Sequence, residues 1–260
     1  MGSFVTVGEL WHREMRQMYR RPLRIISFFI QPLLWLALFG IGLRSLGVRP
    51  NGYDYVLFIL PGILVQRLLS SATRGGMSVL RDRQSGFLRE VFVAPVSRGG
   101  ILMGVTLGVV TRAILEGLLL IGVAYFLGLR LGHDPWVFLN KITALIVLMM
   151  ALGMALVMIG IAVAWMSDDA MTFAVASNWA IFPLSLLSGA LYPVSRLPGW
   201  LAVLSKANPL TYGVDALRQV CLGDRAGNFP FWLDCTVIAA FVFLGLYLGN
   251  TYLRRSSEKA

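Results

Sequence analysis

The sequence predicts an all-α, polytopic membrane protein with six transmembrane helices. The 260 residues are 57% hydrophobic and only 14% charged, and the mean hydropathy is +0.72, whereas soluble domains carry about a quarter charged residues. Apolar runs recur along the chain, and each is close to the ~20 residues that a helix needs to cross a bilayer. The alternating pattern of a membrane β-barrel is absent. The spans are therefore expected to be helices, which satisfy their own backbone hydrogen bonds in lipid.

Six segments are expected to span the membrane. Four of them contain no Asp, Glu, Lys or Arg, namely Ile25–Leu43, Ile142–Ser167, Ala170–Ser195 and Cys235–Leu253. Two more, Tyr55–Thr73 and Ile101–Leu129, are apolar but carry charges. The first span is too long for the apolar part of a cleaved signal peptide, and no small-residue cleavage site follows it, so we expect it to remain in the mature protein.

Basic residues concentrate on one side of this predicted topology. They lie before the first span, between the second and third, and after the sixth, at Arg13, Arg16, Arg20, Arg21, Arg24, Arg74, Arg81, Arg83, Arg89, Arg98, Arg254, Arg255 and Lys259. Because Lys and Arg near short loops favour the cytoplasmic side, both termini are expected in the cytoplasm, with the protein in the inner cell membrane. The net charge of +10 then indicates topology and attraction to anionic lipid rather than binding to nucleic acid.

Residues 1–23 predict an amphipathic interface helix. Apolar residues recur at helical spacing on one face, namely Val7, Leu10, Trp11, Met15 and Met18, with arginines on another face. A basic helix with Trp on its apolar side is typical of segments that lie in the plane of the membrane interface, and Pro22 marks the bend into the membrane. A positively charged anchor without a further role explains the composition equally well.

Residues 80–95 form a second candidate docking element on the same side. Charged and apolar residues alternate irregularly there, and the set includes Arg81, Asp82, Arg83, Phe87, Leu88, Arg89 and Glu90. The segment is too charged for the bilayer and too apolar for water, so we expect it to dock on another protein or on the chain's own helix ends. A simple interfacial turn between helices is the alternative.

Residues 194–234, on the opposite side, predict short outer-face helices. Asn208 is placed to cap a helix that starts at Pro209, and Gly223 is placed to end it. The helix has an apolar stripe on one side, and Asp215 and Arg218 are expected to pair on the other. With a shorter helix over Leu197–Ser205, the region is predicted to form a lid on or in the outer leaflet.

Sites for enzymatic chemistry are not expected. Cys221 and Cys235 are interpreted as free packed thiols, with an outer disulfide as the alternative. The only histidines, His12 and His133, lie outside the spans, which disfavours a zinc or Ser/His site. The adjacent aspartates Asp168–Asp169 are poorly placed for a dyad, because neighbours on a helix point about 100° apart. No phosphate-binding G-x-x-x-x-G-K-[ST] loop occurs, so we predict no catalytic residue, metal or cofactor in this chain.

Three charges lie inside the predicted spans. Arg112 and Glu116 are one helical turn apart and are predicted to neutralise each other, because an unpaired charge at mid-bilayer costs about 2.5–3.5 kcal/mol on insertion scales. A proton or substrate relay is the functional alternative for this pair. Arg67 has no partner in its own span, so it either snorkels to the cytoplasmic edge or meets Glu116 from a neighbouring helix.

Three motifs, in this order along the chain, resemble the ABC-2 family of membrane permeases. They are RDRQSGFLREVFVAPVSR after the second span, SGALYPVSRLPGW at the end of the fifth, and NPLTYGVDALR, which contains Asn208, Pro209, Tyr212, Asp215 and Arg218. The resemblance covers roughly Pro22 to Leu253. The family includes daunorubicin-resistance-type drug exporters and exporters of polysaccharides or lipo-oligosaccharides.

The resemblance implies the membrane subunit of an ATP-driven exporter. Such subunits usually pair, here as a homodimer, and bind two separate ATP-binding cassette subunits that carry ATP and Mg²⁺. The family places an interface helix at the N-terminus and a coupling helix between spans two and three, which match residues 3–21 and about 80–92. The first and fifth predicted spans are rich in aromatic residues. This favours an amphipathic drug-like or lipid substrate over a polysaccharide or lipid-linked glycan. An ion-coupled secondary transporter that uses Arg112 and Glu116 is a weaker alternative.

Overall fold

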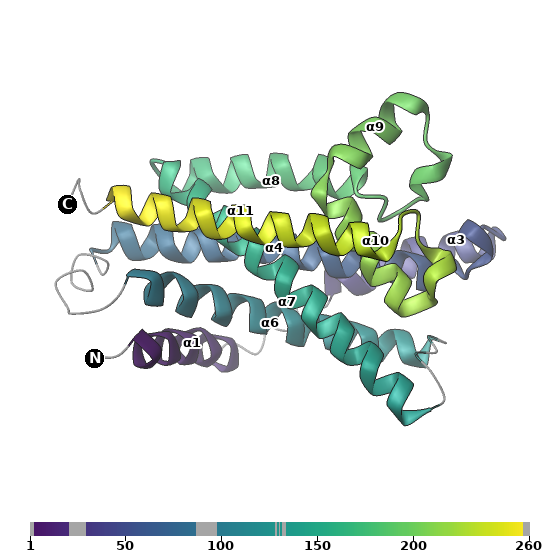
Figure 1. Ribbon diagram of the computed structural model, residues 1–260, viewed down its shortest axis with the longest axis horizontal. Coiled ribbons are helices and arrows are strands. Elements are labelled where there is room, and N and C mark those ends of the chain that lie inside the picture. Colours follow the sequence, from purple (N-terminus) through teal and green to yellow (C-terminus); the bar gives the residue numbers. More distant parts are fainter. Residues whose placement is uncertain are drawn as a thin grey trace.

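The computed structural model describes residues 3–20, 30–86, 98–127, 129, 131 and 134–256. Every regular element in these ranges is a helix, and five are long and apolar enough to cross a membrane: α4 (Tyr55–Gln84), α6 (Arg98–Phe126), α7 (Pro135–Met166), α8 (Ala170–Leu187) and α11 (Phe231–Ser256). They run along one bundle (Figure 1). The all-α class is therefore confirmed for the described residues, and the five apolar helices are consistent with a polytopic membrane protein.

The sixth predicted span is only partly described. A shorter apolar helix covers Ile30–Ser45, with a π-helical middle, η1 (Leu36–Ile41), and an end labelled α3 (Gly42–Ser45). A short turn, η2 (Pro50–Gly52), joins it to α4. The first part of the predicted span, residues 25–29, lies outside the described residues, so the sixth span stays a prediction.

Aspartate caps fix where three of the spanning helices begin. Asp54, Asp134 and Asp169 each precede a helix and accept a hydrogen bond from a backbone N–H of its first turn, which satisfies a donor that the helix cannot pair itself. As a result α7 starts before the predicted Ile142. The other end of a predicted span differs more, because α4 continues for three turns beyond Thr73.

Small residues allow α4 and α7 to cross at close range. A Cβ atom added to Gly76 of α4 would lie only 2.6 Å from the carbonyl oxygen of Gly160 in α7, and one added to Gly160 would overlap the backbone of Ala72. Apolar packing against lipid gives little driving force for helix association, so close backbone approach of this kind is the usual source of contact between spanning helices. α4 is the central helix, since it also packs against α6, α8 and α10 (Pro209–Leu222).

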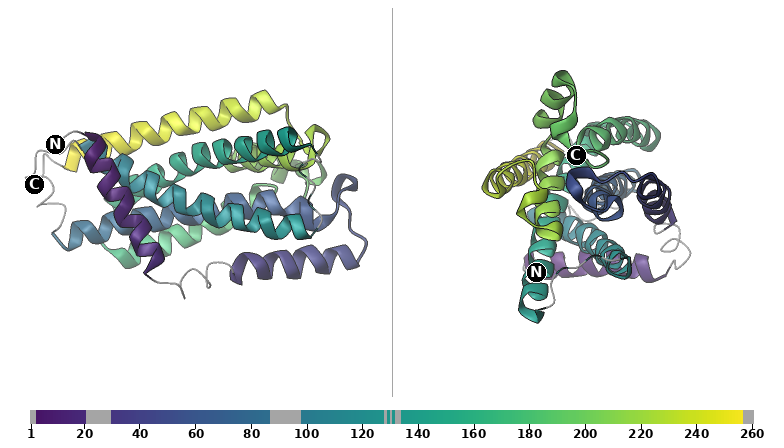
Figure 2. Two further views of the ribbon diagram at one scale, coloured as in Figure 1. Left: turned by 90° about the horizontal axis from the view of Figure 1, so that it is seen from below. Right: turned by 90° about the vertical axis from the view of Figure 1, so that its right-hand side faces the viewer.

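The N-terminal helix lies across one end of the bundle. Figure 2 (left) shows α1 (Ser3–Tyr19) running crosswise to the spanning helices, at the end where α4 and α11 finish and α6 begins. It packs on α6, where Gly104 and Gly108 leave room for Leu10 and Glu14. A helix is therefore present where the sequence predicts one, and its crosswise direction is the one that an interface helix requires, while its place in the membrane interface stays a prediction.

Short helices, which connect α8 to α11 along the chain, lie at the opposite end of the bundle (Figure 1). They are η3 (Val194–Arg196), α9 (Gly199–Ala207), α10 (Pro209–Leu222) and η4 (Asp224–Ala226). The Asn208 side chain caps α10, and Gly223, with a φ of 99°, ends it, as predicted. α10 packs against α4, α7 and α11, so its polar face is buried as well as its apolar stripe. Among these short helices, only α9 exposes large apolar side chains, such as Trp200, which is 67% exposed.

Candidate functional site

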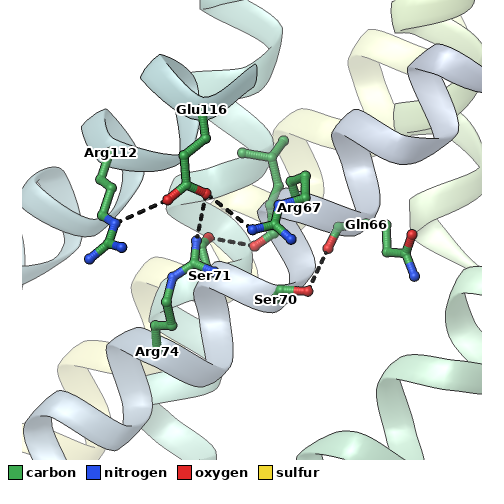
Figure 3. Close-up of polar contacts among 8 residues, drawn as sticks. Gln66, Arg67, Ser70, Ser71, Arg74, Arg112 and Glu116 are labelled. Carbon is green, nitrogen blue, oxygen red and sulfur yellow. Dashed lines mark hydrogen bonds and ion pairs between the residues drawn. The ribbon is translucent and has the colours of Figure 1, made fainter. Parts of the chain in front are cut away.

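A cluster of four charged side chains lies between α4 and α6 inside the bundle (Figure 3). Arg67 and Arg74 come from α4, and Arg112 and Glu116 come from α6; we call them the α4–α6 charge cluster. The Oε2 atom of Glu116 lies 3.4 Å from Nη2 of Arg67 and 3.5 Å from Nη2 of Arg74, and Nε of Arg112 donates to Oε1 at 3.1 Å. Arg67 and Glu116 are only 5% and 6% exposed. Three guanidinium groups thus converge on one buried carboxylate.

The cluster settles two predictions and adds one residue. The Arg112–Glu116 pair is confirmed, and Arg67 meets Glu116 from the neighbouring helix instead of snorkelling. Arg74 was missed, because the predicted span ended at Thr73 and Arg74 was counted as a loop residue. The signal was present in the sequence, since residues seven apart on a helix lie on one face.

The α4–α6 charge cluster has more arginines than carboxylates, and its outlying arginines lie toward the end of the bundle that carries α1. Arg74 and Arg112 are nearer to that end of their helices, and their side chains are more exposed than those of Arg67 and Glu116. Charges inside a span are expensive and mark either structural pairs or paths for polar groups. Here the buried members are bound to one another, so the cluster first of all joins α4 to α6.

A second polar group fastens α1 to the last turns of α4. Nη2 of Arg13 lies 2.9 Å from Oδ2 of Asp82, and Oγ of Ser78 donates to the buried carboxylate of Glu14 at 3.3 Å. Arg83, one residue further, donates to the carbonyl oxygen of Trp165 in α7 at 3.4 Å. The end of α4 is therefore held by two other helices.

These contacts revise the predicted coupling segment. Arg81, Asp82 and Arg83 belong to the last turn of α4, which ends before Gly86 at a φ of 78°, and no separate helix begins at residue 80. The span and the start of the coupling segment form one continuous helix, and the two glycines between them, Gly75 and Gly76, lie where α4 packs closely on α7. Phe87, Leu88, Arg89 and Glu90 lie outside the described residues, so their role stays a prediction.

At the other end of the bundle, Arg218 of α10 is bound by backbone oxygens. Its Nη2 atom donates to the carbonyl oxygen of Gly189 at 2.9 Å and to that of Phe58 at 3.4 Å, and its guanidinium lies 3.9 Å above the ring of Phe58. Burial lowers the pKa of Arg218 to about 10, although the charge of Asp215 opposes the shift. The predicted Asp215–Arg218 pair is wrong: Arg218 reaches α4 and the turn after α8 instead.

The remaining motif residues of α10 each bind a different neighbour. Nδ2 of Asn208 donates to the carbonyl oxygen of Leu184 in α8 at 2.8 Å, and the Tyr212 hydroxyl donates to that of Lys206 in α9 at 2.9 Å. Asp215 accepts from the backbone N–H groups of Asn228 and Phe229 before α11. The predicted outer-face set is therefore a hub that ties α10 to α4, α8, α9 and α11.

An apolar pocket, which we call the aromatic pocket, opens between the helix Ile30–Ser45, α4 and α8. Its lining includes Trp35, Ile59, Gly62, Gln66, Phe182 and Ser185. The ring of Trp35 stacks on that of Phe39 at 4.8 Å, and the Gln66 side chain points away from the charge cluster (Figure 3). The buried Ser185 hydroxyl has no hydrogen-bond partner within the described part of the chain. The pocket thus combines ring surface with two polar groups.

Groups that could support other chemistry are engaged in packing or capping. Both cysteines are free, as predicted, and burial raises the pKa of the Cys221 thiol to about 12. Asp169 caps α8, and hydrogen bonds from the backbone and side chain of Thr172 lower the pKa of its carboxyl. No group of three or more His, Cys, Asp or Glu side chains that could hold a metal ion occurs among the residues with described positions.

The comparison with known families decides the identity of the chain. The family model of the ABC-2 type transporter matches residues 6–222. The chain belongs to the ABC-2 type transporter family. It is 29% identical to ycf38 of Cyanophora paradoxa, described as a transport permease, over 96% of this chain and 85% of the relative. It is 26% identical to the daunorubicin resistance ABC transporter permease protein DrrB1 of Streptomyces coeruleorubidus, over 91% and 81%. It is 24% identical to the inner membrane transport permease YadH of Escherichia coli, over 96% and 93%.

The family match contains most features of this ABC-2 permease described above. It begins within α1 and ends at Leu222, the last residue of α10, so the charge cluster, the α10 hub and the aromatic pocket all lie inside it. The permease is therefore a membrane-embedded transport protein. Asp234 and the rest of α11 lie beyond the matched residues.

Proposed function

We propose that this permease is the membrane subunit of an ATP-driven exporter whose substrate is an amphipathic drug-like or lipid molecule. The observation that carries the proposal is the aromatic pocket. A flat apolar molecule in this pocket would gain contact with the rings of Trp35 and Phe182, and its polar group would gain hydrogen bonds from Gln66 or Ser185. The resistance named in the DrrB1 relative supports export of this class of compound.

The energy source is proposed to be ATP hydrolysis on two separate ATP-binding cassette subunits. They would bind where α1 crosses the bundle and α4 ends, with both termini of the permease in the cytoplasm and the protein in the inner membrane. ATP and Mg²⁺ would sit on those subunits, and the permease itself would be neither an enzyme nor a cofactor protein. Because Asp82 ties the end of α4 to α1, a push on residues 80–95 would reach both helices together.

A second copy of the permease is the proposed partner within the membrane. α8 is an apolar helix that the rest of the chain barely covers, and its exposed side chains include Trp179 and Phe182. Both rings lie on the same helix as Ser185 of the aromatic pocket. A homodimer that covers this helix would enclose the pocket between two copies and leave a path from the inner leaflet.

Two other transport classes remain as alternatives to this proposal. A polysaccharide or lipid-linked glycan exporter would need a continuous file of rings along its path, whereas Phe173, an aromatic residue of α8, is buried in a cluster with Leu80. An ion-coupled transporter would need a carboxylate that binds and releases an ion. Glu116 is a poor choice for this, because three arginines already bind it.

Dye transport into inverted membrane vesicles tests the proposed substrate class. Vesicles that contain the permease and its ATP-binding subunit should accumulate an amphipathic dye when ATP is added. Trp35→Ala should weaken the apparent affinity for the dye about two- to tenfold, because an aromatic contact contributes about 0.5–1.5 kcal/mol. Trp200→Ala is the matched control, since that ring is exposed on α9 outside the pocket. Unchanged dye transport, together with loss of a surface polysaccharide in cells that lack the chain, would favour the glycan alternative.

A further inference from the structure

Two carboxyl groups are buried together at the outer-face end of the bundle. Asp215 belongs to α10 and Asp234 to the first turn of α11, and they are 1% and 0% exposed. Both contact the same atom, Nε2 of Gln219, at 3.2 Å and 2.9 Å. That atom also contacts the carbonyl oxygen of Phe229 at 2.9 Å. We call Asp215 and Asp234 the outer carboxyl pair.

The two carboxyl groups differ in the donors that reach them. Asp215 accepts from the backbone N–H of Asn228 at 2.8 Å, from its side-chain Nδ2 at 3.0 Å and from the backbone N–H of Phe229 at 3.0 Å. Asp234 accepts only from Gln219, and its buried Oδ1 atom has no hydrogen-bond partner in the described part of the chain. Asp215 therefore has the surroundings of a carboxylate, whereas Asp234 does not.

No nearby cation pairs with Asp234 within the described part of the chain, so a negative charge on it beside Asp215 would not be neutralised. The titratable groups toward this end of the elements packed on α10 and α11 include Tyr55, Lys141, Lys206, Tyr212, Arg218, Cys221, Asp224, Arg225 and Cys235. None of them forms an ion pair or hydrogen bond with Asp234 among the described residues. Arg218, the buried cation on α10, points to Gly189 and Phe58 instead. The amide of Gln219 has two hydrogens for three oxygens, so it cannot satisfy all of them at once.

We propose that Asp234 holds a proton at neutral pH and that this proton keeps α10 fastened to the start of α11. A buried carboxylate with no cation and only one shared amide donor is far less stable than the neutral acid. When the outer medium becomes alkaline, the O–H bond of the Asp234 acid breaks, the proton passes to water and the charge stays on Asp234. Two like charges then share Gln219 and repel, which loosens the contact between α10 and α11. The protonation state of the outer carboxyl pair therefore determines how stable the contact between α10 and the start of α11 is.

The sign of the pH effect follows from where the proton is bound. In the unfolded chain an aspartate loses its proton near pH 4, whereas folded Asp234 keeps its proton above that pH. The folded state then binds more protons than the unfolded state, so this residue makes stability fall as pH rises. The permease should be less stable at about pH 9 than at about pH 6.

Thermal unfolding of the full-length permease in detergent micelles tests the proposal. The melting temperature of the wild type should fall by about 3 °C or more between the two pH values. Asp234→Asn, which keeps the size and removes the titrating group, should abolish most of that fall. Asp224→Asn is the matched control, because Asp224 is exposed on η4, and it should leave the fall unchanged. The same fall in wild type and Asp234→Asn would overturn the proposal.

The companion variant Asp215→Asn identifies which carboxyl group holds the proton. It should be less stable than the wild type at both pH values, because an amide nitrogen would face the N–H donors of Asn228 and Phe229. Tolerance of Asp215→Asn together with instability of Asp234→Asn would overturn the assignment. If Asp234→Asn does not fold, hydrogen exchange of residues 229–236 in the wild type gives a second readout. Protection that rises or stays constant toward alkaline pH, after correction for the intrinsic rate, would also contradict the proposal.

Discussion

Glu116 is the common ion-pair partner inside the bundle, because three arginines from two helices contact its carboxylate. The pairing with Arg112 follows from the sequence, since both residues lie one turn apart on one helix. The contacts with Arg67 and Arg74 depend on how α4 packs against α6, which no local pattern specifies. A two-residue pair was therefore predictable, whereas the four-residue cluster required the fold.

Removal of the shared carboxylate should destabilise the permease more than removal of an exposed ion pair. Glu116→Gln removes the negative charge that three guanidinium groups share, and breaking a buried ion pair costs about 3–5 kcal/mol. Arg44→Gln is the control, because the Arg44 side chain is 58% exposed in its pair with Asp54, and such pairs contribute about 0–1 kcal/mol. Melting curves of both variants in detergent provide the measurement.

Exchange of the pair should not restore that loss. In the double variant Arg112→Glu with Glu116→Arg, a new guanidinium would face Arg67 and Arg74, so like charges would meet at the centre of the cluster. Full recovery of the melting temperature by the exchange would mean that Arg67 and Arg74 contribute nothing and that only the local pair matters.

Arg218 illustrates why the second local pairing failed. Asp215 and Arg218 are three residues apart and match the pattern of a surface ion pair. Such a pattern has predictive value only when the helix face is exposed, and here α10 is buried on all sides. Each side chain then binds acceptors or donors from other elements, and the sequence contains no local sign of which they are.

Helix ends at the element scale were predictable where a specific residue defines them. Asn208, Pro209 and Gly223 delimit α10 as expected, because a cap, a first-turn proline and a glycine with positive φ each act locally. The end of α4 was not, because the predicted span followed hydropathy and stopped at Thr73. Hydropathy reports the bilayer boundary, whereas a helix continues into the polar region until a residue such as Gly86 ends it.

The crossing of α4 and α7 should be sensitive to a single methyl group. Gly160→Ala places a Cβ atom against the backbone of Ala72, which cannot rotate away as a side chain can, so we expect a loss of about 1–3 kcal/mol from overpacking. Gly122→Ala in α6 is the matched control, since nothing lies within 4 Å of its added Cβ. That control should be neutral or gain about 0.5–1 kcal/mol from helix propensity. Equal melting temperatures for the two variants would show that the helices can separate without cost.

At the scale of the whole molecule, the order of the spanning helices was predictable and their arrangement was not. Each span is a local apolar run, so the sequence specifies where it lies along the chain. The central place of α4, the insertion of α10 among α4, α7 and α11, and the crosswise direction of α1 all depend on contacts between distant residues. Small residues such as Gly76 and Gly160 permit the arrangement, but their partners cannot be read from one chain.

The orientation of the molecule can be tested at the two ends of α4. Asn51 lies just before this 30-residue helix, and Ser85 lies just after it; both are exposed. A helix of that length extends about 45 Å, enough to place them on opposite sides of a bilayer. Because basic residues gather around α1 and the end of α4, Asn51→Cys should react with a membrane-impermeant thiol reagent in intact cells. Ser85→Cys should react only after the cells are permeabilised.

The background for this labelling experiment follows from the two native thiols. Cys235 is half-buried and is replaced by Ser, whereas Cys221 is buried and can stay. The variant that contains only Cys221 is the negative control for both positions. Labelling of Ser85→Cys from outside, with protection of Asn51→Cys, would invert the topology. The proposed attachment of ATP-binding subunits at the α1 end would then be untenable, because ATP is supplied from the cytoplasm.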